Sequence, residues 1–264
     1  MQTKKIAIIG GGNLGTAIAQ GLIQSEFIAP QLISITKRNT HTLVGLASIG
    51  VNVGSDNISA VQQSEVVILA IKPFQIKEVL EQISPVLQPH HLLISVVTGV
   101  SLDEMKTVIQ KDIPLFRAMP NTAIAIQESI TCISSVFTSE DDNKYVQRLF
   151  SNLGKIALID EKLMNAATVL GACGTAYAMR YIRANIQGGI EIGFDAATAS
   201  LIAAQTVKGA AELLLTTHTH PEQEIDKVTT PKGCTIAGLN EMEHQGFSSS
   251  LIKGIVASYN KIGS

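Results

Sequence analysis

The sequence is poor in the residues that cross-link small extracellular domains or ligate metals. Three cysteines occur in 264 residues, widely spaced and without a Cys-x-x-Cys pair, and the six histidines include no His-Glu-x-x-His motif. These absences argue against a disulfide framework and a zinc knuckle. We expect a cytoplasmic protein, in a reducing compartment, without a metal site.

Aromatic side chains and positive charge are also scarce. Tryptophan is absent, aromatics make up 4% of the chain, and 20 Lys and Arg stand against 22 Asp and Glu, for a formal charge of -2. Platforms that stack bases need aromatics, and nucleic-acid surfaces need a basic excess. No apolar run approaches the 18 or more residues of a membrane-spanning helix. We therefore expect a soluble protein that binds neither nucleic acid nor membrane.

Proline is missing from the hundred residues 121–220, and this gap divides the chain. Before the gap, short β-branched runs alternate with helical patterns, which is typical of a parallel sheet covered by helices. The expected strands are 6–9, 32–36, 51–53, 66–71, 92–97 and 115–116, followed by 129–137 and 155–159 with a helix over 139–152 between the last two. The run 66–71 does not alternate, which indicates a central strand buried on both faces.

After Asp160 the chain becomes rich in alanine. Residues 166–216 predict long helices, broken near Gly193, with Asp195 as the N-cap of the next helix. Small residues along helices permit close packing, and exposed apolar helix faces favour a dimer interface.

A glycine motif follows the first expected strand. Gly10-Gly11-Gly12-Asn13-Leu14-Gly15 matches Gly-x-Gly-x-x-Gly, between that strand and a helical stretch over 14–23. In a dinucleotide site Gly10 makes the tight turn, Gly12 admits the pyrophosphate and Gly15 lets helix and strand pack closely, while the helix N-terminus at Asn13 and Leu14 attracts the phosphates. A ligand-free turn is the alternative, and the strand–helix context argues against it.

The acidic residue that holds a ribose 2'-hydroxyl about 20 positions further on is missing. Lys37, Arg38 and Asn39 follow the second strand instead. Cations there suit a 2'-phosphate, which favours NADPH while leaving NADH possible. A solvated basic turn is the alternative. Asn57, after the third strand, could reach the adenosine ribose.

At this point the chain resembles the pyrroline-5-carboxylate reductase family over essentially its whole length. The matching segments are 10–15, Arg38-Asn39, Ala70-Ile71-Lys72-Pro73, Ser95-Val96-Val97-Thr98-Gly99-Val100, Arg117-Ala118-Met119-Pro120-Asn121-Thr122, Gly174-Thr175-Ala176-Tyr177 and 228–239. The resemblance implies an α/β fold with an N-terminal Rossmann-type NADP-binding domain, residues 1–160. It also implies a C-terminal all-helical dimerisation and substrate domain, residues 161–264, in a homodimer or higher oligomer.

The resemblance further implies NAD(P)H-dependent reduction of the cyclic imine 1-pyrroline-5-carboxylate to L-proline, the last step of proline biosynthesis. Such a reaction needs little acid–base machinery, because a protonated imine accepts hydride readily once the nicotinamide is held close. By resemblance, the backbone N–H groups of Gly233, Cys234 and Thr235 bind the substrate carboxylate, and the Thr235 hydroxyl is the catalytic group at the ring nitrogen. On the residues alone, an ordinary helix start competes, with Thr230 as N-cap and Pro231 in the first turn.

The remaining cofactor residues are placed by the same resemblance. The turn of Ala70, Lys72 and Pro73 would present its backbone to the nicotinamide ribose. Asn121 would bond the carboxamide or order a water, or simply cap a turn.

The chain departs from the family pattern in two places. Residues 171–177 read Gly-Ala-Cys-Gly-Thr-Ala-Tyr where the family usually has Ser-Gly-Ser-Gly-Pro-Ala-Tyr, and Lys232 replaces a usual glycine. These changes leave open a catalytically altered NADP-binding homologue or a reductase of a related cyclic imine. A β-hydroxyacid dehydrogenase would need a catalytic lysine, and Lys162 lacks the surrounding Gly-x-x-x-Asn-Lys pattern.

Overall fold

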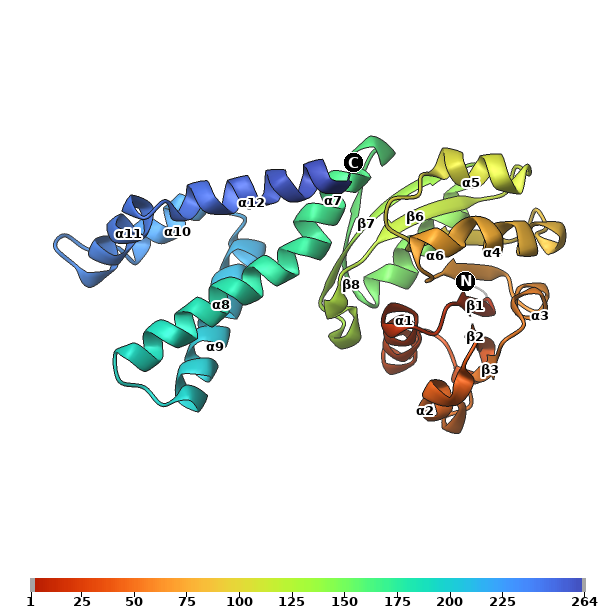
Figure 1. Ribbon diagram of the computed structural model, residues 1–264, viewed down its shortest axis with the longest axis horizontal. Helices are drawn as coiled ribbons and strands as arrows, with labels where there is room; N and C mark the ends of the chain where they lie inside the picture. Colours follow the sequence, from red (N-terminus) through yellow and green to blue (C-terminus); the bar gives the residue numbers. More distant parts are fainter. Residues whose placement is uncertain (1–2, 263–264) are drawn as a thin grey trace. The chain divides into compact units, whose positions relative to one another are not determined.

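The computed structural model describes residues 3–262, which form two compact units, one running up to Cys173 and the other over Gly174–Ile262. The first unit is built on an eight-stranded sheet with the strand order β3-β2-β1-β4-β5-β6-β7-β8 (Figure 1). The strands are β1 (Ile6–Ile9), β2 (Ile33–Thr36), β3 (Asn52–Gly54), β4 (Val66–Leu69), β5 (Leu92–Ser95), β6 (Leu115–Met119), β7 (Ser129–Val136) and β8 (Gly154–Leu158). All eight expected strands are present.

Every neighbouring pair of strands is parallel except β6 and β7. These two strands are joined by the short 3-10 segment η5 (Thr122–Ile126) instead of a crossover helix, so the chain reverses direction between them. The expected parallel sheet is therefore confirmed over its first six strands, and one antiparallel step lies inside the full sheet.

Two helical layers bury the faces of the sheet. One core cluster joins Ile6 and Ile8 of β1 to α1 (Asn13–Gln24), α2 (Val44–Ser48) and α6 (Glu140–Ser151). The other joins Ala7 and Ile9 to α3 (Asn57–Gln62), α4 (Ile76–Ile83) and α5 (Leu102–Ile109). Alternate residues of one strand thus enter opposite cores. All four residues of β4 are buried, which confirms the predicted central strand.

The first unit ends in a helical segment of mixed geometry. The 3-10 turn η6 (Glu161–Leu163) leads into α7 (Met164–Ala167), which continues as the π-helix η7 (Thr168–Cys173). The division between the compact units therefore falls after Cys173. The expected division after residue 160, between a cofactor-binding part and a substrate-binding part, remains a prediction.

The described part of the second unit, 174–262, consists of helices alone. They are α8 (Gly174–Glu191), α9 (Ala196–Thr217), α10 (Pro221–Lys227), α11 (Cys234–His244) and α12 (Phe247–Ile262). The predicted break and cap are confirmed: Gly193 has φ +115°, and Oδ1 of Asp195 accepts hydrogen bonds from the N–H groups of Ala197 and Thr198 at 3.0 and 3.1 Å. Packing of α8 against α9 forms a helical hairpin.

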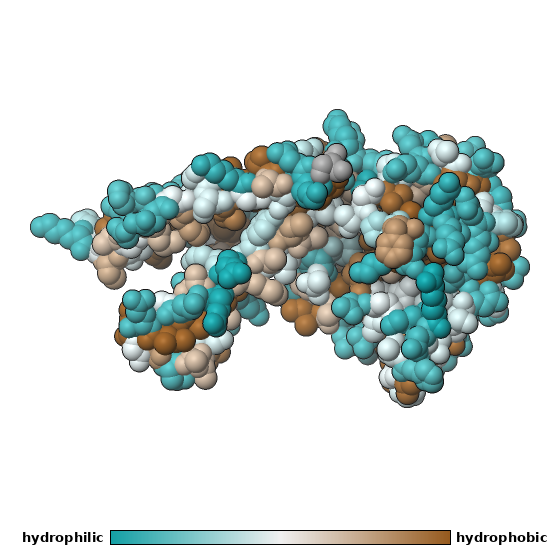
Figure 2. All heavy atoms as spheres, in the orientation of Figure 1, coloured by the Kyte–Doolittle hydropathy of each residue, from teal (hydrophilic) through white to brown (hydrophobic). Residues whose placement is uncertain are grey.

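The helices of the second unit expose large apolar side chains. Leu201 of α9 is 70% and Met179 of α8 is 61% exposed, and brown patches lie over these helices in Figure 2. Helices that bury so little of their apolar surface within one chain need a further surface to cover them. Among residues 3–262, no helix is long and apolar enough to cross a membrane.

Candidate cofactor and substrate sites

A cleft of about 880 Å³ opens at the carboxyl ends of β1, β2 and β4 in the first unit. Ends of parallel strands at a reversal of strand order are where such sheets bind ligands. The cleft brings together ten of the twelve residues predicted to bind cofactor: Gly10, Gly12, Asn13, Leu14, Arg38, Asn39, Asn57, Ala70, Lys72 and Pro73. Gly15 and Asn121 lie outside its lining.

The glycine loop shows why side chains are excluded from it. Gly10 has φ +113°, and a Cβ there would lie 2.4 Å from the carbonyl oxygen of Ala70. A Cβ on Gly15 would lie 2.1 Å from the carbonyl oxygen of Gly10, so glycine is required where α1 crosses β1. A Cβ on Gly12 would meet no described atom within 4 Å, because the space beside it is open to the cleft. Gly12 is also the N-cap of α1 and has no side chain with which to cap the helix, so the loop offers free N–H groups to an anion.

The basic turn after β2 has one anchored cation and one exposed cation. Nζ of Lys37 donates to Oγ1 of Thr42 at 2.7 Å, which holds that side chain along the turn. Arg38 is exposed at the cleft. Oδ1 of Asn39 accepts a hydrogen bond from the N–H of His41 at 3.1 Å, so this side chain also shapes the turn.

The Asn57 amide is fixed by partners from two other elements. Its Oδ1 accepts a hydrogen bond from the buried Thr36 hydroxyl at 2.7 Å, and its Nδ2 donates to Oε1 of Gln82 at 2.9 Å. Helix α4 lines the cleft with Glu78 and Gln82. Sequence reasoning missed both α4 residues, although their i, i+4 spacing puts them on one helix face.

Asn121 uses both ends of its side chain within the protein. Its Oδ1 accepts from the N–H of Ala123 at 3.0 Å, and its Nδ2 donates to the carbonyl oxygen of Gly171 in the π-helix at 3.2 Å. The capped turn that was one interpretation of Asn121 is therefore present. A contact of Asn121 with cofactor remains a prediction.

The expected substrate cradle lies in the second unit. Helix α11 begins at Cys234 with Gly233 as its N-cap, and Gly233 lacks a side chain that could cap the first turn. The competing interpretation with Thr230 as N-cap is wrong, because the N–H of Gly233 donates to the Thr230 carbonyl in a turn before the helix, at 2.9 Å. Lys232 within that turn has φ +60°, a conformation that glycine adopts without strain. The structure thus presents Gly233, Cys234 and Thr235 together at a helix start.

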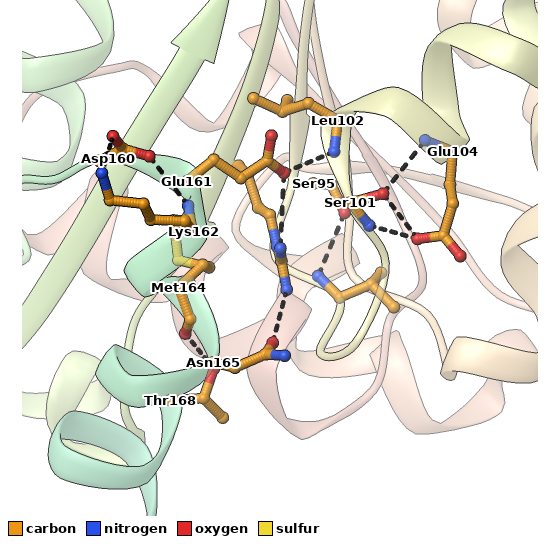
Figure 3. Close-up of polar contacts among 12 residues, drawn as sticks. Ser95, Ser101, Leu102, Glu104, Asp160, Glu161, Lys162, Met164, Asn165 and Thr168 are labelled. Atoms are coloured by element: carbon orange, nitrogen blue, oxygen red, sulfur yellow. Dashed lines mark hydrogen bonds and ion pairs between the residues drawn. The ribbon is translucent and has the colours of Figure 1, made fainter. Parts of the chain in front are cut away.

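A buried arginine of β6 forms an ion pair with a half-buried glutamate in the first unit (Figure 3). The guanidinium of Arg117, which is 4% exposed, lies 3.5 Å from Oε1 of Glu161 and donates from Nη2 to Oδ1 of Asn165 at 3.5 Å. Burial lowers the pKa of Arg117, and the negative charge of Glu161 partly offsets this effect. The sequence pattern marked Arg117 only as part of a matching segment, and nothing in it pointed to Glu161 or Asn165.

Lys162 and the possible metal ligands were the other candidates for a catalytic or metal-binding role. Nζ of Lys162 pairs with Asp160 at 3.0 Å on the surface. No group of three His, Cys, Asp or Glu side chains within residues 3–262 is placed to hold a metal ion.

Comparison with known proteins identifies relatives of both halves. A family model described as pyrroline-5-carboxylate reductase dimerisation matches residues 161–264, and one described as NADP oxidoreductase, coenzyme F420-dependent, matches residues 5–99. The chain is 46% identical to pyrroline-5-carboxylate reductase 1 of Dictyostelium discoideum over 98% of its own length, but spans only 49% of that protein. It is 42% identical to pyrroline-5-carboxylate reductase 2 of the same organism, covering 98% of this chain and 92% of that one.

Solved structures give the same picture. Pyrroline carboxylate reductase of Plasmodium falciparum, a structure with NADP bound, matches with a TM-score of 0.91 at 26% identity over 100% of both chains. The enzyme of Streptococcus pyogenes matches with a TM-score of 0.86 at 30% identity over 98% of both. A 3-hydroxyisobutyrate dehydrogenase of Mycobacterium tuberculosis matches with a TM-score of 0.55 at 14% identity, over 74% of this chain and 67% of that one, which is a likeness of fold.

Proposed function

Because the chain belongs to the pyrroline-5-carboxylate reductase family, we propose that it reduces 1-pyrroline-5-carboxylate to L-proline with NADPH. The observation that carries the proposal is the family match over nearly the whole chain, together with an intact glycine-loop cleft in the first unit. The protein is an oxidoreductase that acts on a cyclic imine, and it assembles as a homo-oligomer through the dimerisation region at 161–264.

The cleft suits NADPH in charge and shape. Free N–H groups at the start of α1 would bind the pyrophosphate beside Gly12, and Arg38 would form charge-assisted hydrogen bonds to the 2'-phosphate. The fixed amide of Asn57 would bind the adenosine ribose, and the turn of Ala70, Lys72 and Pro73 would contact the nicotinamide ribose. When bound, the cofactor supplies a hydride to the imine carbon.

The chain's own contribution to the reaction is to bind and orient the substrate. The N–H groups of Gly233, Cys234 and Thr235 would hold the carboxylate at the start of α11. The Thr235 hydroxyl would hydrogen-bond the ring nitrogen, which arrives protonated and becomes the amine of proline as its carbon accepts the hydride. No strong base is needed, in keeping with a site built from backbone and hydroxyl groups.

We infer that residues 1–160 carry the cofactor site, and that residues 161–264 carry the substrate site and the dimer contacts. The cytoplasm is the compartment we propose, since Cys132, Cys173 and Cys234 are all free thiols.

The test is oxidation of NADPH by the purified chain with 1-pyrroline-5-carboxylate as substrate. We expect loss of NADPH absorbance and one L-proline formed for each NADPH oxidised, with no oxidation when the substrate is left out. A chain that binds NADPH tightly but forms no proline would be the catalytically altered homologue, and the proposed activity would be wrong.

A further inference from the structure

Helix α5 is held at its start by a residue far away in the chain. The N–H of Leu102, the first residue of α5, donates to Oε1 of Glu161 at 2.6 Å. The helix already has a local capping box, in which Ser101 and Glu104 satisfy each other's N–H groups. The Glu161 carboxylate therefore adds a second, long-range attachment at the same helix end.

The carboxylate of Glu161 is itself held by a buried cation. Nη1 of Arg117 lies 3.5 Å from the oxygen that accepts from Leu102, so one carboxylate oxygen joins β6 to the start of α5 (Figure 3). The second arm of the guanidinium, Nη2, donates to Asn165 and fixes the direction from which Arg117 approaches. A charged partner in low-dielectric surroundings strengthens the hydrogen bonds of this oxygen.

The segment anchored by this contact lines the cofactor cleft. Residues 96–101 connect β5 to α5, and Val96, Val97 and Thr98 are part of the cleft lining. The N–H of Val96 bonds the Leu69 carbonyl at 3.0 Å, so β4 holds one end of the segment while Glu161 holds the other. The proposed function assigns the 2'-phosphate to Arg38 at the end of β2, so the nicotinamide half of the cofactor extends toward the ends of β4 and β5.

We propose that Glu161 is a positioning residue for the nicotinamide half of the cofactor. Its carboxylate, oriented by Arg117, holds the start of α5 and thereby sets segment 96–101 against that half of NADPH. The adenosine half, at the ends of β1 and β2, is independent of this contact. The proposal rests on the proposed function for the direction in which the cofactor lies.

The experiment compares two ligands on the full-length protein: NADPH, and 2',5'-ADP as a probe of the adenosine half alone. For Glu161→Ala we expect the Kd of NADPH to rise about tenfold, because the charge-assisted hydrogen bond that holds the Leu102 N–H is lost and segment 96–101 is no longer fixed. The Kd of 2',5'-ADP should be unchanged. Glu161→Gln keeps an oxygen for the Leu102 N–H and should show a smaller rise. Lys162→Ala, in the same turn, removes only a surface ion pair and is the matched control, with both constants unchanged.

A purely structural role would lower Tm and leave both Kd values of the folded protein as they are, and that result would overturn the proposal. Equal weakening of both ligands would overturn it too, since the effect would then not be confined to the nicotinamide half. If Glu161→Ala does not fold because Arg117 is left buried without its partner, Glu161→Gln carries the same comparison. Binding is measured without turnover, so a wild-type chain that binds NADPH but forms no proline would refute the proposed activity alone. A wild-type chain that binds neither ligand would refute both proposals.

Discussion

Under the proposed function, discrimination between the two nicotinamide cofactors would depend most directly on Arg38, the exposed cation that follows β2 at the cleft. Arg38→Ala should weaken NADPH by roughly 1 to 3 kcal/mol, the range for hydrogen bonds to a charged group, and should leave NADH nearly unchanged. Fluorescence titration of the variant with each cofactor measures both affinities. Equal losses for NADPH and NADH would contradict a 2'-phosphate contact.

Thr235 is the only member of the proposed substrate cradle whose side chain offers a hydroxyl. Thr235→Ala should lower kcat/KM for 1-pyrroline-5-carboxylate by about tenfold to a hundredfold, because the hydrogen bond to the ring nitrogen is lost in the transition state. Thr235→Ser keeps the hydroxyl and should be far milder. The Kd of NADPH should stay the same in both variants. An unaltered kcat/KM in Thr235→Ala would show that this residue has no catalytic role and only forms part of the first turn of α11.

The residues of the candidate site differ in how visible they are in the sequence. Gly10, Gly15 and Arg38 could be named because their roles follow from local geometry after a strand. Gln82 and Glu161 could not, because each acts on a partner 25 or 59 residues away in the chain. Contacts of that kind depend on strand order and helix placement, which a local pattern does not contain.

At the scale of elements, a buried histidine is bonded at the start of β5, and we expect this contact to depend on pH. His91, 2% exposed, accepts the N–H of Gln88 at Nδ1 at 2.7 Å and so donates from Nε2 toward the Val61 carbonyl at 3.3 Å. Burial, and then the neighbouring His90, lowers the pKa of His91 from the ordinary value of 6.5. The unfolded chain therefore binds a proton at a pH where the folded chain does not.

We expect the free energy of unfolding to fall as the pH drops below about 6.5, the pKa of an unperturbed histidine. Denaturant unfolding at several pH values between 7.5 and about 5 measures this slope. This pH range lies above the range in which carboxylates with a lowered pKa, such as Glu104, bind protons. His91→Gln should flatten the slope, whereas His90→Gln, at an exposed neighbour, should keep most of it. If the free energy of unfolding of His91→Gln depended on pH as it does in the wild type, groups other than His91 would cause the dependence.

The elements themselves were largely predictable, because buried β-branched runs and glycine or proline punctuation are local signals. The antiparallel step at β6 and β7 was not, since the length of η5, and not the strand pattern, sets the direction of β7. The competing interpretation, with Thr230 as N-cap, put the start of α11 three residues before the observed N-cap, Gly233. Pro231 suits a first helical turn, but Lys232 adopts φ +60° and delays the helix to Cys234.

At the scale of the whole molecule, the apolar helices of the second unit should form most of a homodimer interface larger than about 2,000 Å². A truncated chain ending at Cys173 should then be monomeric by light scattering, bind NADPH and form no proline, since it lacks α8–α12. A chain ending at Asp160 should unfold at a lower temperature than the chain ending at Cys173, because it also lacks Glu161 and Asn165, the partners of buried Arg117. Full-length protein that is monomeric at micromolar concentration would contradict the interface.

The same buried arginine imposes an order of events on the nascent chain. The ribosome delivers Arg117 before its partners Glu161 and Asn165, which follow 44 and 48 residues later. Until they emerge, closing β6 into the sheet would enclose an unpaired charge, at a cost of several kcal/mol. We therefore expect the cofactor-binding unit to complete its folding during synthesis only after the ribosome has translated the first residues of the region that matches the dimerisation family.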